Sequence, residues 1–363
     1  MSAPQQIIAL LIKKMFAMME FAWWTFVHKI LLLISVYMVM SLKVPPLEQD
    51  NDDDHLSNYI ILETLGEGAF GKVVRCQKNG ETYAMKIQEK IGTEFLEDEV
   101  RVLRTIGNNY TCVKTVSIFD DDTRHYIVFE KLYKSLYQII SSDLLKDADI
   151  VSVTKQTLEA LLYLHSKNII HGDIKPENIM FTNILCKKIK LIDFGLSTFD
   201  ESTKKTNTIA TAPYRCPESI FNLIWSFGVD IWALGCVICE MKTGKLFFDS
   251  GDHCEEEPND DAKQRHLSQI ERVCGPFTKQ MVRKCPQMFT EEGRCGSQFM
   301  SDESKQILKK QMMIKEVFAN NEDMANLVKK MLTIDPCRRI SVAGAMRHKL
   351  KEPFDAASAD IRI

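Results

Sequence analysis

The sequence predicts an α+β fold, and three observations lead to this prediction. Short β-type runs lie at residues 59–65, 73–76 and 82–87, a helical pattern of apolar residues fills residues 94–106, and a more apolar helical pattern opens at Asp230. Runs rich in β-branched and aromatic residues between turn signals are typical of strands, whereas apolar residues three and four positions apart are typical of helices. At 363 residues the chain is long enough for one large two-lobed domain or for two ordinary domains.

Composition excludes several classes of protein. Hydrophobic residues make up 45% of the chain and charged residues 26%, which excludes wholesale disorder. The net charge of −3, from 46 Lys and Arg against 49 Asp and Glu, argues against a dedicated nucleic-acid binder, so we expect no direct nucleic-acid partner. The 11 cysteines are scattered, as expected for reduced thiols in a cytosolic or nuclear protein. Cys236 and Cys239 lie in the apolar helical pattern, so we expect buried thiols there instead of a redox or zinc site.

Residues 1–45 form a hydrophobic N-terminal segment that differs from the rest of the chain. Its longest uncharged run, residues 30–42, is shorter than the about 20 residues that a membrane span needs. Joining it to residues 21–27 would place His28 and Lys29 inside the span. Three interpretations stay open: membrane association of residues 7–44 as an anchor or interfacial helix, an amphipathic helix packed on the domain that follows, or a stretch missing from a mature protein that starts at Met40. An acidic linker, residues 46–58, follows and is expected to be solvated.

A glycine-rich motif follows the first β-type run. It reads Gly66-Glu67-Gly68-Ala69-Phe70-Gly71. The same spacing occurs in dinucleotide-binding folds, but there a helix opens at the third glycine. Here residues 73–76 form a second β-type run that ends at the turn Asn79-Gly80, and a third run carries Lys86. The order of glycine loop, hairpin and lysine-bearing strand predicts a lid over nucleotide phosphates.

Lys86 and a glutamate of the following helix are expected to form an ion pair. Glycines allow backbone amides to approach phosphates, and Lys86 supplies a positive charge for the α- and β-phosphate oxygens. A buried lysine needs an acidic partner, and we choose Glu99 because apolar residues three, four and seven positions later then share one inward face. Glu97 would point elsewhere. The alternative is a surface helix with salt bridges and no catalytic glutamate.

Three motifs make the sequence resemble the eukaryotic protein kinases. His171-Gly172-Asp173-Ile174-Lys175-Pro176-Glu177-Asn178 matches their catalytic loop in its serine/threonine form, Asp193-Phe194-Gly195 matches their magnesium-binding motif, and Cys216-Pro217-Glu218 stands where they have Ala-Pro-Glu. The resemblance covers roughly four-fifths of the chain, from residue 59 to about residue 353. It implies a two-lobed protein kinase fold: a small β-rich N-lobe with one key helix (residues 59–132), a larger, mainly helical C-lobe (133–354) and a C-terminal tail (355–363).

The resemblance also implies the roles of the site residues, with ATP and Mg²⁺ as cofactors. The catalytic residues would be Asp173, which accepts or orients the proton of the substrate hydroxyl, Lys175, which stabilises the transferring phosphoryl group, and Lys86. Asn178 and Asp193 would hold two magnesium ions. Adenine would be bound by an apolar sandwich and by the backbone after the gatekeeper Phe129, through Val73, Ala84, Met180, Glu130 and Leu132.

Other positions match the internal supports of the family. Three stacked side chains would tie the helix of Glu99 to the catalytic loop, one carboxylate would bind the backbone of that loop, and one buried ion pair would anchor the peptide-binding segment. These residues are Leu103, His171 and Phe194 for the stack, Asp230 for the carboxylate, and Glu218 with Arg339 for the pair.

Two elements indicate a branch of the kinase family. Tyr214-Arg215 before Cys-Pro-Glu is typical of the CMGC group, and residues 266–272 followed by Gly275-Pro276 are similar to the element that names the LAMMER (CLK-like) dual-specificity kinases, from which they depart at three central positions. The resemblance implies phosphorylation of Ser/Thr, with Tyr as a further acceptor, and Arg/Ser-rich splicing factors as candidate protein substrates. We expect a monomer in the nucleus or cytoplasm. The alternatives are a membrane-tethered kinase of another CMGC branch, a pseudokinase scaffold and, for residues 266–272, an ordinary amphipathic helix.

Two further features bear on regulation and substrate choice. Gly172 replaces the arginine that normally pairs with an activation-loop phosphate, which predicts activity without such a phosphate. The acidic insertion at residues 255–261 would either attract basic substrates or form a solvated loop.

Overall fold

The structure is a computed structural model that describes residues 55–68, 71–90, 94–142, 145–183, 187–200, 209–249, 260–298 and 300–350. The predictions on residues 1–45, Ala69, Phe70 and the tail 355–363 therefore lie outside the described residues, as does most of the acidic linker and of the acidic insertion. Within the described ranges, no helix combines the length and the apolar character that a membrane crossing requires.

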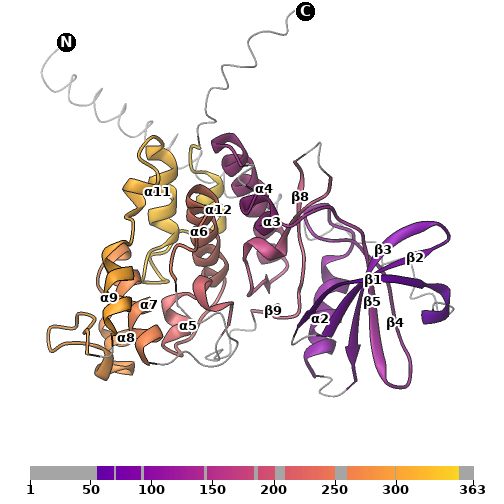
Figure 1. Ribbon diagram of the computed structural model, residues 1–363, viewed down its shortest axis with the longest axis horizontal. Coiled ribbons are helices and arrows are strands. Elements are labelled where there is room, and N and C mark those ends of the chain that lie inside the picture. The colour runs from indigo at the N-terminus through magenta and orange to yellow at the C-terminus, as the bar shows by residue number, and fades with distance from the viewer. Residues whose placement is uncertain are drawn as a thin grey trace, which may run out of the picture. The chain divides into compact units, whose positions relative to one another are not determined.

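The N-lobe is built on a five-stranded antiparallel sheet in the order β1-β2-β3-β5-β4 (Figure 1). Its strands are β1 (Ile60–Gly68), β2 (Gly71–Lys78), β3 (Glu81–Glu89), β4 (Thr115–Asp120) and β5 (Arg124–Glu130). Asn79 and Gly80 join β2 to β3 with φ of 52° and 85°, the positive values that tight hairpin turns require. The predicted hairpin is therefore present, and Lys86 lies in β3.

The two faces of this sheet are buried in different ways. Successive side chains of β5 point to opposite faces, so Tyr126 and Val128 join a small cluster with Tyr59, whereas Ile127 joins the main core. The helix α2 (Glu94–Ile106) belongs to the main core, with its apolar residues Val102, Leu103 and Ile106 buried. The predicted inward face of this helix is confirmed, and α2 positions Glu99 towards the interior.

The C-lobe is mainly helical, so the expected two-lobed fold is confirmed (Figure 1). Its central helix is α6, in which every residue from Val229 to Met241 is buried, as expected for a helix that is apolar on all sides. Cys236 and Cys239 are buried free thiols of α6. The helices of the C-lobe are α3 (Leu136–Ile140), α4 (Asp147–Ser166), α5 (Pro217–Ile220), α6 (Gly228–Thr243), α7 (Asp260–Cys274), α8 (Lys279–Lys284), α9 (Asp302–Lys309), α10 (Ile314–Val317), α11 (Glu322–Met331) and α12 (Val342–Met346).

Two small strand pairs hold the loops of the C-lobe that carry the sequence motifs. β6 (Ile169–Ile170) pairs with β9 (Thr198–Phe199), and β7 (Ile179–Phe181) pairs with β8 (Ile189–Leu191). The catalytic-loop motif lies between β6 and β7, and the Asp-Phe-Gly motif lies between β8 and β9. The pairing of β6 with β9 and of β7 with β8 therefore fixes both motifs side by side.

The element that resembles the LAMMER signature lies in α7 and is more buried than an ordinary amphipathic helix. All residues from His266 to Glu271 are buried. Arg265 donates a hydrogen bond from Nη1 to Ser304 Oγ at 2.9 Å, and Glu271 Oε2 accepts one from the backbone of Cys295 at 2.9 Å. The polar residues of this helix therefore hold neighbouring segments of the C-lobe in place.

Candidate active site

Lys86 of β3, Glu99 of α2 and Asp193 of the Asp-Phe-Gly motif meet in one cluster. The Lys86 ammonium lies 2.8 Å from both carboxylate oxygens of Glu99 and 3.6 Å from Asp193 Oδ1. Lys86 is 7% exposed and Glu99 3% exposed, whereas Glu97 is exposed to solvent. Burial raises the pKa of Glu99 above its ordinary value, although the charge of Lys86 acts in the opposite direction. The cluster joins the two lobes, because Asp193 belongs to the C-lobe.

Asp173 lies at the centre of a second cluster, which comes from the catalytic loop. Its Oδ2 lies 2.7 Å from Lys175 Nζ and accepts a hydrogen bond of 3.1 Å from Asn178 Nδ2. Asn178 Nδ2 also donates to the backbone carbonyl of Asp173 at 2.9 Å. Burial raises the pKa of Asp173, but the charge and hydrogen bond of Lys175 outweigh it, so the pKa lies below its ordinary value. Asp173 is therefore held as a carboxylate, the form that can accept a proton.

Thr211 completes this cluster, although none of the sequence motifs predicted it. Its backbone N–H and its hydroxyl both donate to Asp173 Oδ1, at 3.1 and 2.7 Å, and the hydroxyl accepts from Lys175 Nζ at 3.0 Å. Thr211 lies 38 positions from Asp173 in the sequence, so only the tertiary fold brings the two together. The sequence signal that could have found it is its place directly ahead of the Ala-Pro-Tyr-Arg segment.

The residues proposed as magnesium ligands present the type of atom that this ion prefers. Asp193 offers a carboxylate that is 40% exposed, and Asn178 uses its amide nitrogen towards Asp173, so a metal would use its amide oxygen. Among the described residues, no group of three or more His, Cys, Asp or Glu side chains forms a closed metal site. This donor set fits Mg²⁺, which is commonly held by one or two protein ligands together with phosphate oxygens.

Asp193 also has an unusual backbone. Its φ of 58° lies in the left-handed region that residues other than glycine rarely adopt. Its Oδ1 accepts a hydrogen bond of 3.3 Å from the backbone N–H of Gly195. Such conformations persist where surrounding contacts hold them, and they are frequent at functional sites.

The residues expected around adenine lie on the strands and the connection between the lobes. Val73 of β2, Ala84 of β3 and Met180 of β7 are half-buried, and Ala84 is paired with Phe129 across β3 and β5. Glu130 ends β5, and its carboxylate accepts a hydrogen bond of 2.7 Å from the backbone of Lys114 and pairs with Lys190. Leu132 is buried in the main core just beyond β5.

Asp230 of α6 holds the backbone of the catalytic loop in place. Its two carboxylate oxygens accept hydrogen bonds of 2.9 Å from the backbone N–H groups of His171 and Gly172, and Oδ2 lies 2.9 Å from His165 Nε2. The pKa of the fully buried Asp230 is lowered, because the bond and charge of His165 outweigh its burial. The His171 ring lies 5.1 Å from the Phe194 ring. These contacts match the supports expected from the resemblance.

Glu218 and Arg339 form a buried ion pair between α5 and the segment after α11. Arg339 Nη1 lies 2.5 Å from Glu218 Oε1, and Nη2 lies 2.8 Å from Oε2, which is a bidentate geometry. Both side chains are 1% exposed. Arg339 also donates to the backbone carbonyls of Gly228 and Thr333 at 2.9 Å. The pair therefore ties the segment of Cys216-Pro217-Glu218 to the core of the C-lobe.

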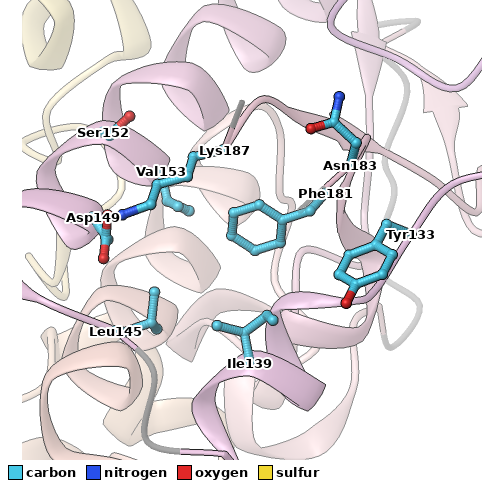
Figure 2. A pocket seen from close by; sticks show the side chains of 9 residues that line it. All are labelled: Tyr133, Ile139, Leu145, Asp149, Ser152, Val153, Phe181, Asn183 and Lys187. Carbon is cyan, nitrogen blue, oxygen red and sulfur yellow. Dashed lines mark hydrogen bonds and ion pairs between the residues drawn. The ribbon is translucent and has the colours of Figure 1, made fainter. Parts of the chain in front are cut away.

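A cavity elsewhere in the C-lobe contains none of the predicted site residues. It has a volume of 130 Å³ and lies among α3, α4 and β7. Figure 2 shows the ring of Phe181 pointing towards the other side chains that line the cavity, among them Leu145 and Ile139. Asp149 and Lys187 form an ion pair of 2.5 Å at its edge. The lining is mainly apolar, so the cavity does not have the chemistry of a phosphate site.

Comparison with known proteins places the chain in a family. Residues 59–351 match the family model of the protein kinase domain. The serine/threonine-protein kinase AFC2 of Arabidopsis thaliana is 30% identical over 357 residues, which cover 84% of this chain and 81% of that protein. The human dual specificity protein kinase CLK1 is 30% identical over 347 residues, covering 83% and 69%, and the dual specificity protein kinase lkh1 of Schizosaccharomyces pombe is 28% identical over 349 residues, covering 82% and 49%. The chain belongs to the protein kinase family and is a serine/threonine kinase similar to the CLK and AFC kinases of the LAMMER type.

Proposed function

We propose that this kinase transfers the γ-phosphate of ATP through the two clusters around Lys86 and Asp173. The observation that carries the proposal is that Lys86 contacts both Glu99 and Asp193, while Asp173 is held by Lys175, Asn178 and Thr211. Phosphoryl transfer depends mainly on positioning and on charge stabilisation, and these residues provide both.

Each residue has a separate task in this proposal. Asp173 orients the acceptor hydroxyl and takes its proton, and Lys175 neutralises negative charge on the transferring group. Lys86 binds α- and β-phosphate oxygens, and Glu99 holds Lys86 in place. Asn178 and Asp193 bind Mg²⁺, which neutralises charge on the phosphates when it is bound. The glycine motif at residues 66–71 covers the phosphates, and Val73, Ala84, Met180, Glu130 and Leu132 bind adenine.

The pseudokinase alternative is disfavoured by these contacts. Every position that phosphotransfer needs carries a suitable side chain, and the Lys86–Glu99 pair is formed. Phosphotransfer by the purified protein with Mg²⁺ and ATP tests the alternative directly: transfer that exceeds the background of an Asp173→Asn protein supports an enzyme, and its absence supports a scaffold.

The proposed substrates are serine and threonine residues in basic, Arg/Ser-rich proteins such as splicing factors, with tyrosine as a further acceptor. The support for both kinds of acceptor is similarity to kinases that are named dual specificity kinases. The choice of Arg/Ser-rich proteins rests on the resemblance of residues 266–272 to the LAMMER element. The acidic insertion at residues 255–261 gives weaker support for basic substrates. Its last two residues, Asp260 and Asp261, begin α7, and Asp261 already accepts a hydrogen bond of 2.7 Å from Ser304 Oγ.

An oriented peptide library tests this substrate proposal. We expect selection of arginine around the acceptor serine. Selection of proline directly after the acceptor, without basic selectivity, would instead support another CMGC branch. The Asp173→Asn protein is the matched control, and only selection that exceeds its residual labelling is assigned to the site around Asp173.

We further propose a monomer in the nucleus or cytoplasm, with residues 59–132 and 133–354 as the two lobes. Membrane association through residues 7–44 is the alternative. Fractionation of cells that express either the full chain or a chain starting at Met40 tests it. Equal distribution of both chains supports the first proposal, and loss of membrane-bound protein in the shorter chain supports the alternative.

A further inference from the structure

Gly172 lies where two parts of the activation segment, residues 193–218, meet the catalytic loop. A Cβ atom at Gly172 would lie 2.7 Å from Ile209 Cδ1 and 2.8 Å from the backbone oxygen of Leu196, and the backbone there has a φ of 80°. Leu196 belongs to the start of the segment and Ile209 to its later part. No ordinary side chain fits between these atoms without displacing them. The absence of a side chain therefore allows both parts of the segment to pack on the catalytic loop.

Ile209 is held from the other side by Ser219 of α5. Its backbone N–H donates to Ser219 Oγ at 3.1 Å, and its carbonyl accepts from the same hydroxyl at 3.3 Å. Ile209 is 6% exposed, and Ser219 is fully buried. The side chain of Ile209 thus packs on the catalytic loop while its backbone is bound to the helix that follows the segment.

A short turn links Ile209 to Thr211, because only Ala210 lies between them. Ala210 has a φ of 70°, a left-handed conformation that a residue with a side chain keeps only when its surroundings hold it. Arg215 Nε donates to the Ala210 carbonyl at 2.9 Å. With this short turn fixed at Ile209, the N–H and hydroxyl of Thr211 reach Asp173 Oδ1.

We propose that Ile209 is a positioning residue for phosphotransfer: it packs against Gly172, is bound by Ser219, and thereby holds Thr211 on Asp173. The inference rests on the proposed function, since it assigns the arrangement of the same catalytic cluster to an apolar contact. Ile209 acts through Thr211 and touches neither substrate nor nucleotide.

Steady-state kinetics of Ile209→Ala test the proposal. We expect kcat to fall at least about tenfold while KM for ATP stays within about twofold, because the contact acts on Asp173 and leaves the nucleotide site unchanged. Ile209→Val should restore most of the activity. Ile314→Ala is the matched control, since Ile314 is similarly buried at 7% exposure and belongs to α10, which packs on α6 and α11. Equal kcat values for Ile209→Ala and Ile314→Ala would overturn the proposal.

Epistasis with Thr211 separates positioning from general destabilisation. In a Thr211→Ala background, Ile209→Ala should lower kcat by less than about twofold, because the contact through which it acts is already lost. If Ile209→Ala lowered kcat as much in the Thr211→Ala protein as in the wild-type protein, Ile209 would not act through Thr211.

Hydrogen exchange of the Thr211 amide provides a readout that does not depend on activity. This N–H donates to Asp173, so Ile209→Ala should accelerate its exchange, whereas Ile314→Ala should not. Unchanged exchange in Ile209→Ala would overturn the inference even if the wild-type protein proved inactive. Absence of phosphotransfer by the wild-type protein would overturn only the proposed function.

Discussion

Lys86 and Glu99 show how single side chains depend on one another in the interior of the site. Lys86 is buried and lies 2.8 Å from both oxygens of Glu99. A buried charge without a partner is costly, so the two residues cannot be replaced independently. Glu97, two positions earlier on the same helix, is exposed to solvent.

Glu99→Ala should therefore impair both stability and nucleotide binding. We expect the free energy of unfolding to fall by about 3–5 kcal/mol, because the buried Lys86 loses its closest partner and only Asp193, at 3.6 Å, is left beside it. KM for ATP should rise, since Lys86 is no longer held towards the phosphates. Denaturant unfolding and steady-state kinetics measure the two effects. Glu97→Ala is the control and should leave both unchanged, whereas equal effects of the two variants would contradict the assigned pair.

At the scale of elements, the segment Cys216-Pro217-Glu218 is anchored by one buried ion pair. Glu218 of α5 and Arg339 beyond α11 lie 121 positions apart in the sequence and bind through two hydrogen bonds. α5 has only four residues and is too short to be stable by itself, so its position depends on this tertiary contact.

A double-mutant cycle measures this anchor. Arg339→Met and Glu218→Leu should each lower the free energy of unfolding by about 3–5 kcal/mol, because each leaves one buried charge unpaired. The double variant should lose clearly less than the sum of the two, since it leaves no unpaired charge. Thermal and urea unfolding provide the values. Strict additivity would show that the two side chains do not interact.

The elements themselves could be predicted from sequence to different degrees. The helix at residues 94–106 was predicted with its observed bounds, because its periodic apolar face is a local signal. β1 extends beyond the predicted run into the glycine motif, and α6 begins two residues before Asp230. Thr211 and Ile209 were not predicted, because their contacts with Asp173 and Gly172 arise only when the activation segment folds back on the catalytic loop. Local patterns do not encode such contacts.

At the scale of the whole molecule, the pH dependence of stability includes a buried carboxyl group. Glu240 of α6 is 4% exposed and accepts a hydrogen bond of 2.7 Å from the Tyr214 hydroxyl. Burial raises the pKa of Glu240 from 4.5 to about 7; the bond from Tyr214 lowers it, and the nearby charge of Glu177 raises it. Between pH 4.5 and about 7, the Glu240 carboxyl group therefore keeps its proton in the folded state and has released it in the unfolded state.

Glu240→Gln should change how the free energy of unfolding depends on pH. Between pH 4.5 and about 7, the free energy of unfolding of the wild-type protein should fall relative to the variant, because only the folded wild-type protein still binds the proton. Above pH 7 the difference should stay constant. The comparison with the variant is needed because His266, whose pKa burial lowers to about 4, contributes with the opposite sign. Urea unfolding from pH 4.5 to 8 tests this, and a difference independent of pH would contradict it.

Transfer of labelled γ-phosphate from Mg²⁺-ATP to protein substrate by wild-type and Asp173→Asn proteins tests most directly whether one site carries the activity. The substitution keeps the shape of the side chain but removes its ability to accept the hydroxyl proton. We expect kcat to fall by about 100-fold to 10,000-fold, with ATP affinity and melting temperature nearly unchanged. Undiminished transfer by the Asp173→Asn protein would contradict the assignment of Asp173 and of the site built around it.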